Sequence, residues 1–176
     1  NQAQVKIIVL SQSRLDELRA EFGQDGIEYI LSTPDLIRSA ASVSDIVIGS
    51  VYVIGKEAPK VLCKDVLKDM TAGSVLVDIS IDQGGCFETS KPTTHDDPTY
   101  MVDGIVHYCV ANMPGSVPRT SSEALNNATL PHVLALADKG VAALDDDPHL
   151  ANGLNVAGGK IVYQAVLDAI DEELSA

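Results

Sequence analysis

Two apolar runs that stop abruptly in polar and turn-forming residues constrain the fold of this chain most. The first is Val77-Asp78-Ile79-Ser80-Ile81-Asp82-Gln83-Gly84-Gly85, and the second is Ala111-Asn112-Met113-Pro114-Gly115-Ser116-Val117-Pro118-Arg119-Thr120. Strands that end in this way build the ligand crevice of an open α/β sheet. The sequence therefore predicts a parallel sheet with a binding crevice at the carboxyl ends of its strands.

Short β-branched runs alternate with helical patterns along the first two thirds of the chain. We expect strands at 5–10, 28–31, 45–50, 74–81 and 105–110, and helices after Ser11, after Thr33 and over 60–70. This alternation is typical of βαβ units and a parallel sheet. Aromatic residues make up only 4% of the chain and Trp is absent, so Val, Ile, Leu and Ala must fill the core. Such a core suits strands that are buried on both faces.

The pattern becomes helical after Arg119. We expect one helix from Ser121 or Ser122 to Gly140 and a second from Lys160 to about Leu174, with a turn or short helix starting at 145–148. We expect two parts, 1–118 and 119–176. The helices of the second part carry more apolar surface than they can bury against one another, which predicts a partner domain or a neighbouring subunit.

Charge and cysteine usage exclude several classes of function. The formal net charge of −13 disfavours binding to nucleic acid and to anionic membrane surfaces. No apolar run approaches the roughly 18 residues of a membrane span, and no signal peptide is visible. Three widely spaced cysteines match no metal or redox spacing and indicate reduced thiols in a cytoplasmic protein. We expect His95-Asp96-Asp97 to form a turn, and we expect no metal site.

Five long stretches in series resemble the alanine dehydrogenase family and its relative, the nicotinamide nucleotide transhydrogenase α subunit. The family pattern reads VDxAIDQGG, THDDPTY, GxxHYxVANMPGxVPRTS, LxNATLPY and GLN…GK, and the matching stretches here are 77–85, 94–100, 104–121, 125–132 and 153–160. The resemblance implies a Rossmann-like α/β fold and NAD-dependent oxidative deamination of L-alanine to pyruvate and ammonia. Uninterrupted runs at 77–85 and 94–100 favour the dehydrogenase. A transhydrogenase α-subunit-like fragment and a non-catalytic oligomerisation or interaction module remain alternatives.

The resemblance also implies roles for individual residues. Asp82 lies beside the nicotinamide and its ribose, and Asn112 lies beside the keto acid, so both are candidate catalytic residues. The candidate contacts to the dinucleotide are Arg14, Ser32, Val51, Tyr52, Ile79, Asp82 and Met113. From the residues alone, Asp82 before Gln-Gly-Gly could equally cap a turn.

The chain lacks parts that the family carries. The Gly-x-Gly-x-x-Gly loop that binds pyrophosphate is missing, so we expect the chain to begin after that loop. The substrate domain with the family's catalytic His, Lys and Arg is likewise missing. An acidic residue normally binds the adenosine ribose at the position of Val9 or Leu10, and Ser11 or Gln12 could partly replace it. We expect weak or no activity from this chain alone.

Loss of the first strand has a structural consequence. In the strand order 3-2-1-4-5-6 that strand lies between the strands headed by Val5 and Asp45, so the sheet is incomplete. Unpaired strand edges invite pairing with another chain. We therefore expect Val5–Leu10 either to shift into the open position or to pair across a dimer, and we expect a homo-oligomer formed through the unpaired strand or exposed helix faces.

Overall fold

A computed structural model describes residues 3–54 and 57–175, without the side chains of 172–175. The chain divides into two compact units. One comprises Asn1–Tyr52 with Ala58–Ala111, and the other comprises Val53–Glu57 with Asn112–Ala176. Each unit is described by itself below.

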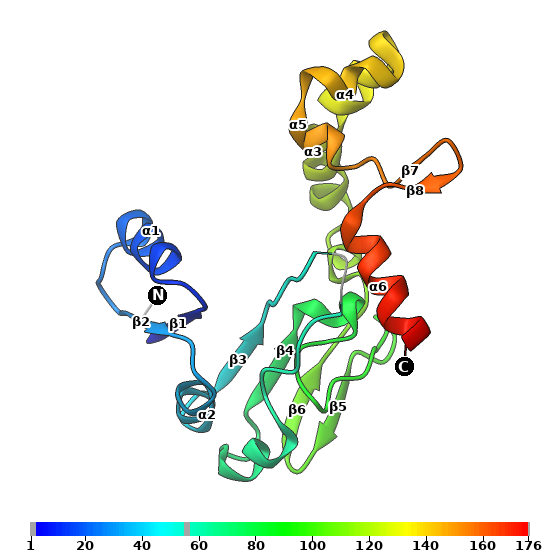
Figure 1. The fold of residues 1–176 in the computed structure, drawn as a ribbon. Helices are drawn as coiled ribbons and strands as arrows, with labels where there is room; N and C mark the ends of the chain where they lie inside the picture. Colours follow the sequence, from blue (N-terminus) through cyan, green and yellow to red (C-terminus); the bar gives the residue numbers. More distant parts are fainter. Residues whose placement is uncertain (1–2, 55–56, 176) are drawn as a thin grey trace. The chain divides into compact units, whose positions relative to one another are not determined.

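The first unit begins with a small βαβ motif, drawn in blue in Figure 1. Strand β1 (Val5–Val9) pairs in parallel with β2 (Ile27–Leu31), and helix α1 (Gln12–Phe22) connects them. The hydroxyl of Ser11 caps this helix by accepting a hydrogen bond from the amide of Arg14 at 3.3 Å. Gly23 ends the helix at a φ of 74°, which a residue with a Cβ adopts only with strain.

The first unit also contains a four-stranded sheet. Its order is β3 (Ile46–Gly49), β4 (Val75–Asp78), β6 (Ile105–Tyr108) and β5 (Thr99–Val102). Strands β3, β4 and β6 are parallel, as the sequence predicts. Helix α2 (Pro34–Ser42) precedes β3, with Thr33 as its cap. The prediction of an α/β fold with a predominantly parallel sheet is confirmed.

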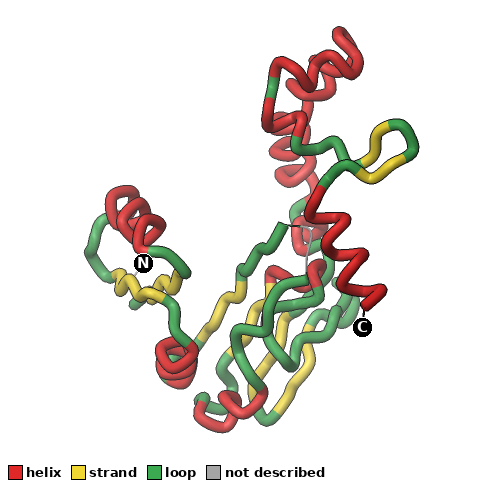
Figure 2. Tube along the Cα trace, viewed as in Figure 1, coloured by secondary structure: helices red, strands yellow, loops and turns green. Residues whose placement is uncertain are grey.

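Two local predictions are wrong. The strand expected over 74–81 ends at Asp78, because the chain turns there into the 3-10 helix η2 (Ile79–Gln83). Residues 60–70 are not one helix, and only the 3-10 helix η1 (Lys64–Asp69) forms there. The segment before it is extended because Leu62 bridges Phe87, with the amide of Val61 donating to the carbonyl of Cys86 at 2.8 Å. The sequence analysis also missed β5, which runs antiparallel to β6. Figure 2 shows how much of the chain between β3 and β5 is loop.

The two sheets of the first unit remain separate. Among the described residues β1 pairs only with β2, and β3 pairs only with β4. The prediction that Val5–Leu10 shifts into the position beside β3 is therefore wrong. All five residues of β1 stay in register with β2, so the βαβ motif keeps its own hydrogen-bond ladder. Pairing across a dimer stays a prediction.

The core lies against the four-stranded sheet. Its largest apolar side chains come from the sheet and from the loops that cover it: Leu62, Leu67, Leu76, Phe87 and Ile105. Arg38 of α2 joins η1 by ion pairs to Asp65 and Asp69, and its Nε lies 2.9 Å from the Asp69 carboxylate. These pairs are exposed, so packing contributes more to stability than they do.

The second unit is mainly helical. It contains the 3-10 helices η3 (Met113–Ser116) and η4 (Gly140–Ala142) and the helices α3 (Pro118–Lys139), α4 (Ala143–Asp146), α5 (Pro148–Ala151) and α6 (Gln164–Ser175). The last helix begins at Gln164 rather than Lys160, because β8 (Lys160–Ile161) pairs with β7 (Val156–Ala157). The predicted C-terminal helical segment is confirmed.

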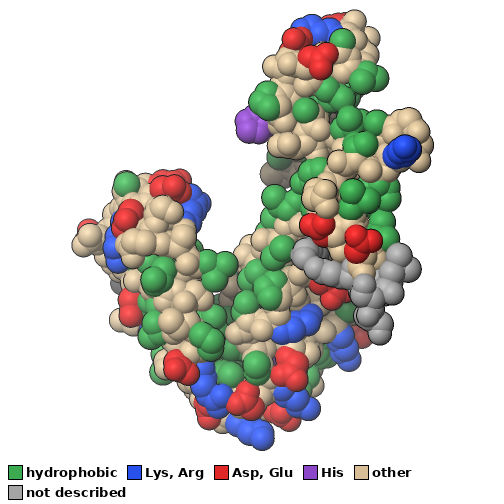
Figure 3. Space-filling view, viewed as in Figure 1, with side chains coloured by type: hydrophobic (Ala, Val, Ile, Leu, Met, Phe, Trp, Pro, Cys, Tyr) green, Lys and Arg blue, Asp and Glu red, His purple; other side chains and the backbone are tan. Residues whose placement is uncertain are grey.

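Helix α3 exposes apolar side chains. None of its residues is buried, and Leu125, Val133 and Leu134 are each more than half exposed. Figure 3 shows hydrophobic side chains at the surface of the helical unit. Within the described part of the chain, no helix is both long enough and apolar enough to cross a membrane.

His107 is a fully buried polar residue within the sheet. Its Nδ1 lies 3.0 Å from the carbonyl oxygen of Ile105, which can only accept, so Nδ1 carries the hydrogen. Its Nε2 lies 2.7 Å from the hydroxyl of Thr89, and its ring stacks on Tyr100 at a centroid distance of 4.9 Å. Burial lowers the pKa of His107 below its ordinary 6.5.

This shift predicts a loss of stability in acid. Below pH 6.5 the unfolded chain binds a proton at His107 that the folded chain does not bind, so the free energy of unfolding falls as pH decreases. Urea unfolding between pH 5 and pH 8 measures this slope. His107→Gln removes the titrating group and should flatten the slope below pH 6.5. An identical slope in the wild type and the variant would contradict the prediction.

Candidate functional site

The carboxyl end of β4 is organised by a buried carboxylate. Asp78 is 0% exposed, and its Oδ2 accepts hydrogen bonds from the amides of Cys86 at 2.8 Å and Phe87 at 3.3 Å and from the hydroxyl of Ser90 at 2.5 Å. Its Oδ1 accepts from the amide of Ser80 at 3.0 Å and lies 3.4 Å from the Cys86 thiol. Buried polar groups of this kind need all their partners, so Asp78 fixes the whole 79–90 loop to the strand end.

Two glycines allow the backbone of this loop to pack closely against Asp78 and against the end of β3. Gly85 has a φ of 76°, and a Cβ there would lie 2.9 Å from Oδ2 of Asp78. Gly49 ends β3 beneath the loop, and a Cβ there would lie 2.6 Å from Cζ of Phe87. Outside the loop, the ammonium group of Lys60 donates to the carbonyls of Gly84 and Gly85, the latter at 2.7 Å. The backbone from Asp78 to Cys86 is therefore held by two side chains: the Asp78 carboxylate, which the loop encloses, and the Lys60 ammonium group, which lies outside the loop.

Cys86 lies inside this arrangement and is fully buried. Burial, together with the neighbouring Asp78 charge, raises the pKa of its thiol to about 12. The thiolate is the nucleophilic form of cysteine, so a thiol with this pKa does not react at neutral pH. Its role is packing against the end of β3.

The loop joins the ends of β4 and β3. Its first turn is the 3-10 helix η2 (Ile79–Gln83), which begins directly after Asp78. The hydroxyl of Ser80 accepts from the amide of Val51 at 2.7 Å and donates to the carbonyl of Val51 at 2.8 Å. On the same turn, Ile79 is 51% exposed and the side chain of Asp82 is also exposed. Val51 and the turn that carries Ile79 and Asp82 therefore form one connected platform.

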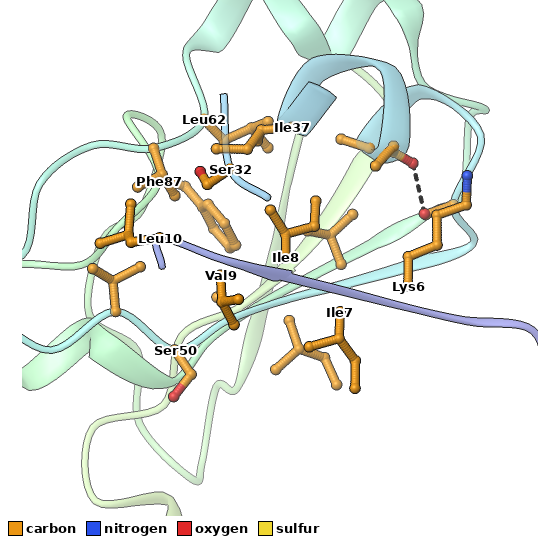
Figure 4. A pocket seen from close by; sticks show the side chains of 18 of the residues that line it. Lys6, Ile7, Ile8, Val9, Leu10, Ser32, Ile37, Ser50, Leu62 and Phe87 are labelled. Atoms are coloured by element: carbon orange, nitrogen blue, oxygen red, sulfur yellow. Dashed lines mark hydrogen bonds between the residues drawn. The ribbon is translucent and has the colours of Figure 1, made fainter. Parts of the chain in front are cut away.

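A pocket of about 400 Å³ lies between the two sheets of the first unit (Figure 4). Its lining is mostly apolar and comes from β1, from α2, from β3 and the residues after it, and from the loops that carry Leu62 and Phe87. Ser32 and Val51 both line this pocket, which brings together two of the residues singled out in the sequence.

Other predicted residues lie outside the pocket lining. Arg14 is on the exposed surface of α1, where its guanidinium pairs with Glu17 at 2.7 Å. Tyr52 is 72% exposed. The side chain of Gln12 donates to Asp16 at 2.9 Å, and Ser11 caps α1, so both candidate replacements for the missing acidic residue are engaged elsewhere.

Asn112 and Met113 belong to the second unit. Asn112 has a φ of 58° and precedes η3, which starts at Met113. Asn tolerates this left-handed conformation better than most residues. Asn112 is exposed and Met113 is half-buried. Both residues come after β6 in the sequence and are the first residues of the second segment of the helical unit.

The described residues contain no group of three or more His, Cys, Asp or Glu side chains that could hold a metal ion. At the β4 end, Asp82, hydroxyl groups and the backbone can form hydrogen bonds.

The family model for the alanine dehydrogenase/PNT C-terminal domain matches residues 1–164. The chain belongs to this family. The resemblance noted in the sequence is confirmed. The chain is 56% identical over 172 residues to alanine dehydrogenase of Halomonas elongata, covering 97% of this chain and 46% of that protein. It is 48% identical to alanine dehydrogenase of Lysinibacillus sphaericus, covering 95% of this chain and 45% of that protein.

Solved structures support the same assignment. An L-alanine dehydrogenase structure superposes with a TM-score of 0.82 at 45% identity, covering 97% of this chain and 47% of that chain. A transhydrogenase from Sinorhizobium meliloti superposes with a TM-score of 0.66 at 21% identity, covering 93% of this chain and 43% of that chain, which shows the shared fold alone. The chain spans about half the length of the relatives it matches.

The sequence analysis missed the residues that build the platform. The family motif includes Asp78 and Ser80 without giving either a role, and the helical spacing over 60–70 wrongly places Lys60 in a helix. A usable signal was present for Asp78, because an acid inside an apolar strand must find several donors at close range. For Ser80 and Lys60 the sequence carries no such signal, since their partners are distant backbone groups.

Proposed function

We propose that this chain forms the dinucleotide-binding part of an NAD-dependent L-alanine dehydrogenase, which oxidises L-alanine to pyruvate and ammonia. The main support is that Val51 and Asp82 follow the carboxyl ends of the paired parallel strands β3 and β4, where an open α/β sheet binds its ligand. Membership of the alanine dehydrogenase/PNT family and the names of the relatives support the choice of reaction. L-alanine and pyruvate are the proposed substrates.

The residues present fit part of a nicotinamide dinucleotide. Ser32 and Val51 follow the carboxyl ends of β2 and β3, and an open α/β sheet binds its ligand at the carboxyl ends of its strands, so both residues can contact one ring system and its ribose. When bound, NAD supplies the hydride acceptor of the reaction. Val51, Tyr52, Ile79 and Met113 would give apolar contacts, and Arg14 would lie towards the adenosine end.

Two side chains of this chain carry the proposed chemistry at the reacting end. Asp82 is an acceptor that can take hydrogen bonds from ribose hydroxyls or from a bound water. Asn112 offers both an amide donor and a carbonyl acceptor, which can orient a keto acid without proton transfer. In the intact enzyme, residues 1–118 bind the dinucleotide and residues 119–176 pack on the substrate domain. The free thiols Cys63, Cys86 and Cys109 favour the cytoplasm as its location.

We expect weak binding of NADH by the chain alone. A fluorescence titration should give a Kd weaker than about 100 μM, which corresponds to roughly 5.5 kcal/mol of binding free energy. The reason is that Val9 and Leu10 provide no carboxylate for the adenosine ribose. Asp82→Asn should weaken binding about tenfold further, by loss of a charged acceptor.

Asp96→Asn, an exposed substitution outside the pocket and the platform, is the matched control and should leave the Kd unchanged. Equal affinities in the wild type and Asp82→Asn would contradict the role of Asp82. Absence of saturable NADH binding by the wild type would contradict the proposed function.

We also propose that the chain forms a homo-oligomer, through its unpaired strand edges or through the apolar face of α3. The amide of Val5 donates to the carbonyl of Gly26, and the carbonyl of Val9 accepts from Ser32, so odd-numbered residues of β1 bond on the β2 side. Because the hydrogen-bonding direction alternates along a strand, Ile8 directs its N–H to the open edge.

Sedimentation equilibrium tests this proposal. We expect a dimer or larger species. Ile8→Pro should dissociate it if strand edges pair, because proline removes the free donor, and Leu125→Ser should dissociate it if the α3 face is buried. A wild-type monomer at all concentrations would show the proposal to be wrong.

A further inference from the structure

The carboxyl end of β1 lies at the same edge of its sheet as Ser32, a candidate contact to the dinucleotide. Strands β1 and β2 run parallel, and the amide of Ser32 donates to the carbonyl of Val9 at 2.8 Å. The residues that follow β1 therefore belong to the same strand-end crevice. In a dinucleotide-binding sheet, an acid at such a strand end bonds to the ribose 2′-hydroxyl of NAD, whereas an arginine nearby accommodates the 2′-phosphate of NADP.

No acidic residue stands at this strand end. The last residue of β1 is Val9, and Leu10 after it is 86% exposed. Residues 11–14 are Ser, Gln, Ser and Arg, and the first turn of α1 carries no acid. Asp16 and Glu17, the next acids in the sequence, each form an ion pair with an arginine of α1. The group that would repel a phosphate on the ribose is therefore absent.

Hydrogen-bond donors follow this strand end instead. The hydroxyl oxygens of Ser11 and Ser13 lie 3.2 Å apart, and both side chains are exposed. Two hydroxyls that share one hydrogen bond keep a second hydrogen for an outside acceptor. The guanidinium of Arg14 is exposed, and its Nη1 donates to Glu17 at 2.7 Å. A guanidinium carries five N–H donors and exposed ion pairs contribute little, so Arg14 can also bond to a phosphate oxygen.

We propose that Arg14, together with the hydroxyls of Ser11 and Ser13, binds the 2′-phosphate of NADPH and makes this crevice prefer NADPH over NADH. Val9 permits the preference, because it places no carboxylate against the phosphate. Charge-assisted bonds to the phosphate offset the ribose contact that is lost with the carboxylate. The inference rests on the proposed function for the position of the dinucleotide and goes beyond it in choosing between the two dinucleotides.

Titrations of the whole chain with NADPH and with NADH test the preference. We expect NADPH to bind about tenfold more tightly, which corresponds to about 1.4 kcal/mol. Adenosine 2′,5′-bisphosphate carries the ribose phosphate without the nicotinamide, and it should bind about tenfold more tightly than adenosine 5′-monophosphate. An increase of NaCl from about 50 to about 300 mM should weaken NADPH binding more than NADH binding, since salt screens an exposed pair of phosphate and arginine.

Two arginine variants locate the phosphate contact. Arg14→Gln should reduce the ratio of the NADH and NADPH dissociation constants from about ten to about two or less. Arg19→Gln is the matched control, because Arg19 lies on the same helix, pairs with Asp16 at 3.5 Å and carries the same charge. It should keep the wild-type ratio. An unchanged ratio in Arg14→Gln would overturn the proposal, and so would an equal fall in both variants, since net charge would then explain the preference.

Acidic variants test the role of the strand end. Val9→Asp restores the carboxylate and should reverse the preference, because the acid repels the 2′-phosphate and accepts from the ribose hydroxyls of NADH. Val9 is half-buried, so Leu10→Asp provides a second acid at an exposed side chain that tolerates charge. It should lower the ratio several-fold, whereas the neutral match Leu10→Asn should keep it. If neither acid lowers the ratio, the proposal is wrong.

The remaining outcomes separate this inference from the proposed function. Equal affinities for the two dinucleotides, or a tighter complex with NADH, overturn the inference and leave the proposed function standing. Absence of saturable NADH binding contradicts the proposed function, and the two adenosine phosphates still decide the inference. A preference for the 2′,5′-bisphosphate that Arg14→Gln removes supports it, and equal binding or no binding of the two compounds refutes it.

Discussion

The candidate site depends on one buried carboxylate. Asp78 stands where β4 ends, and five donors from residues 80–90 converge on it. A carboxylate removed from water is costly unless its oxygens are satisfied, so the loop must keep the one conformation that supplies these donors. This requirement turns a loop of polar residues and glycines into a fixed platform and leaves Asp82 and Ile79 exposed on its outer side.

Rigidity of this kind is useful for binding. A site held by its own hydrogen bonds need not be ordered when the ligand arrives, which avoids an entropic cost of association. In the first unit, the platform supplies Val51 to the pocket wall, and the β1–α1–β2 motif supplies the residues on the other side. The two sheets share no ladder among the described residues, and residues of both β1 and β3 line the pocket.

Much of the fold could be predicted from the sequence because its signals are local. Runs such as Val5–Val9 and Ile46–Gly49 are β-branched and bounded by turn residues, and each forms a strand close to the expected bounds. Residues 60–70 show the limit, since the helical spacing there was overridden by pairing of Leu62 with Phe87, which lies distant in sequence. The same limit applied to the site: family motifs identified Asp82, whereas Ser80 and Lys60 act on distant backbone groups that no local pattern reveals.

Substitution of Asp78 by Asn is the most direct test of this account. Asn keeps the size of the side chain, but its amide NH2 group replaces one acceptor oxygen and faces backbone N–H donors. The free energy of unfolding in urea should therefore fall by about 3 kcal/mol or more. Asp45→Asn, an exposed acid just before β3, should change it by less than about 0.5 kcal/mol. A loss below about 0.5 kcal/mol for Asp78→Asn, with unchanged amide exchange over 79–90, would contradict the central role of this carboxylate.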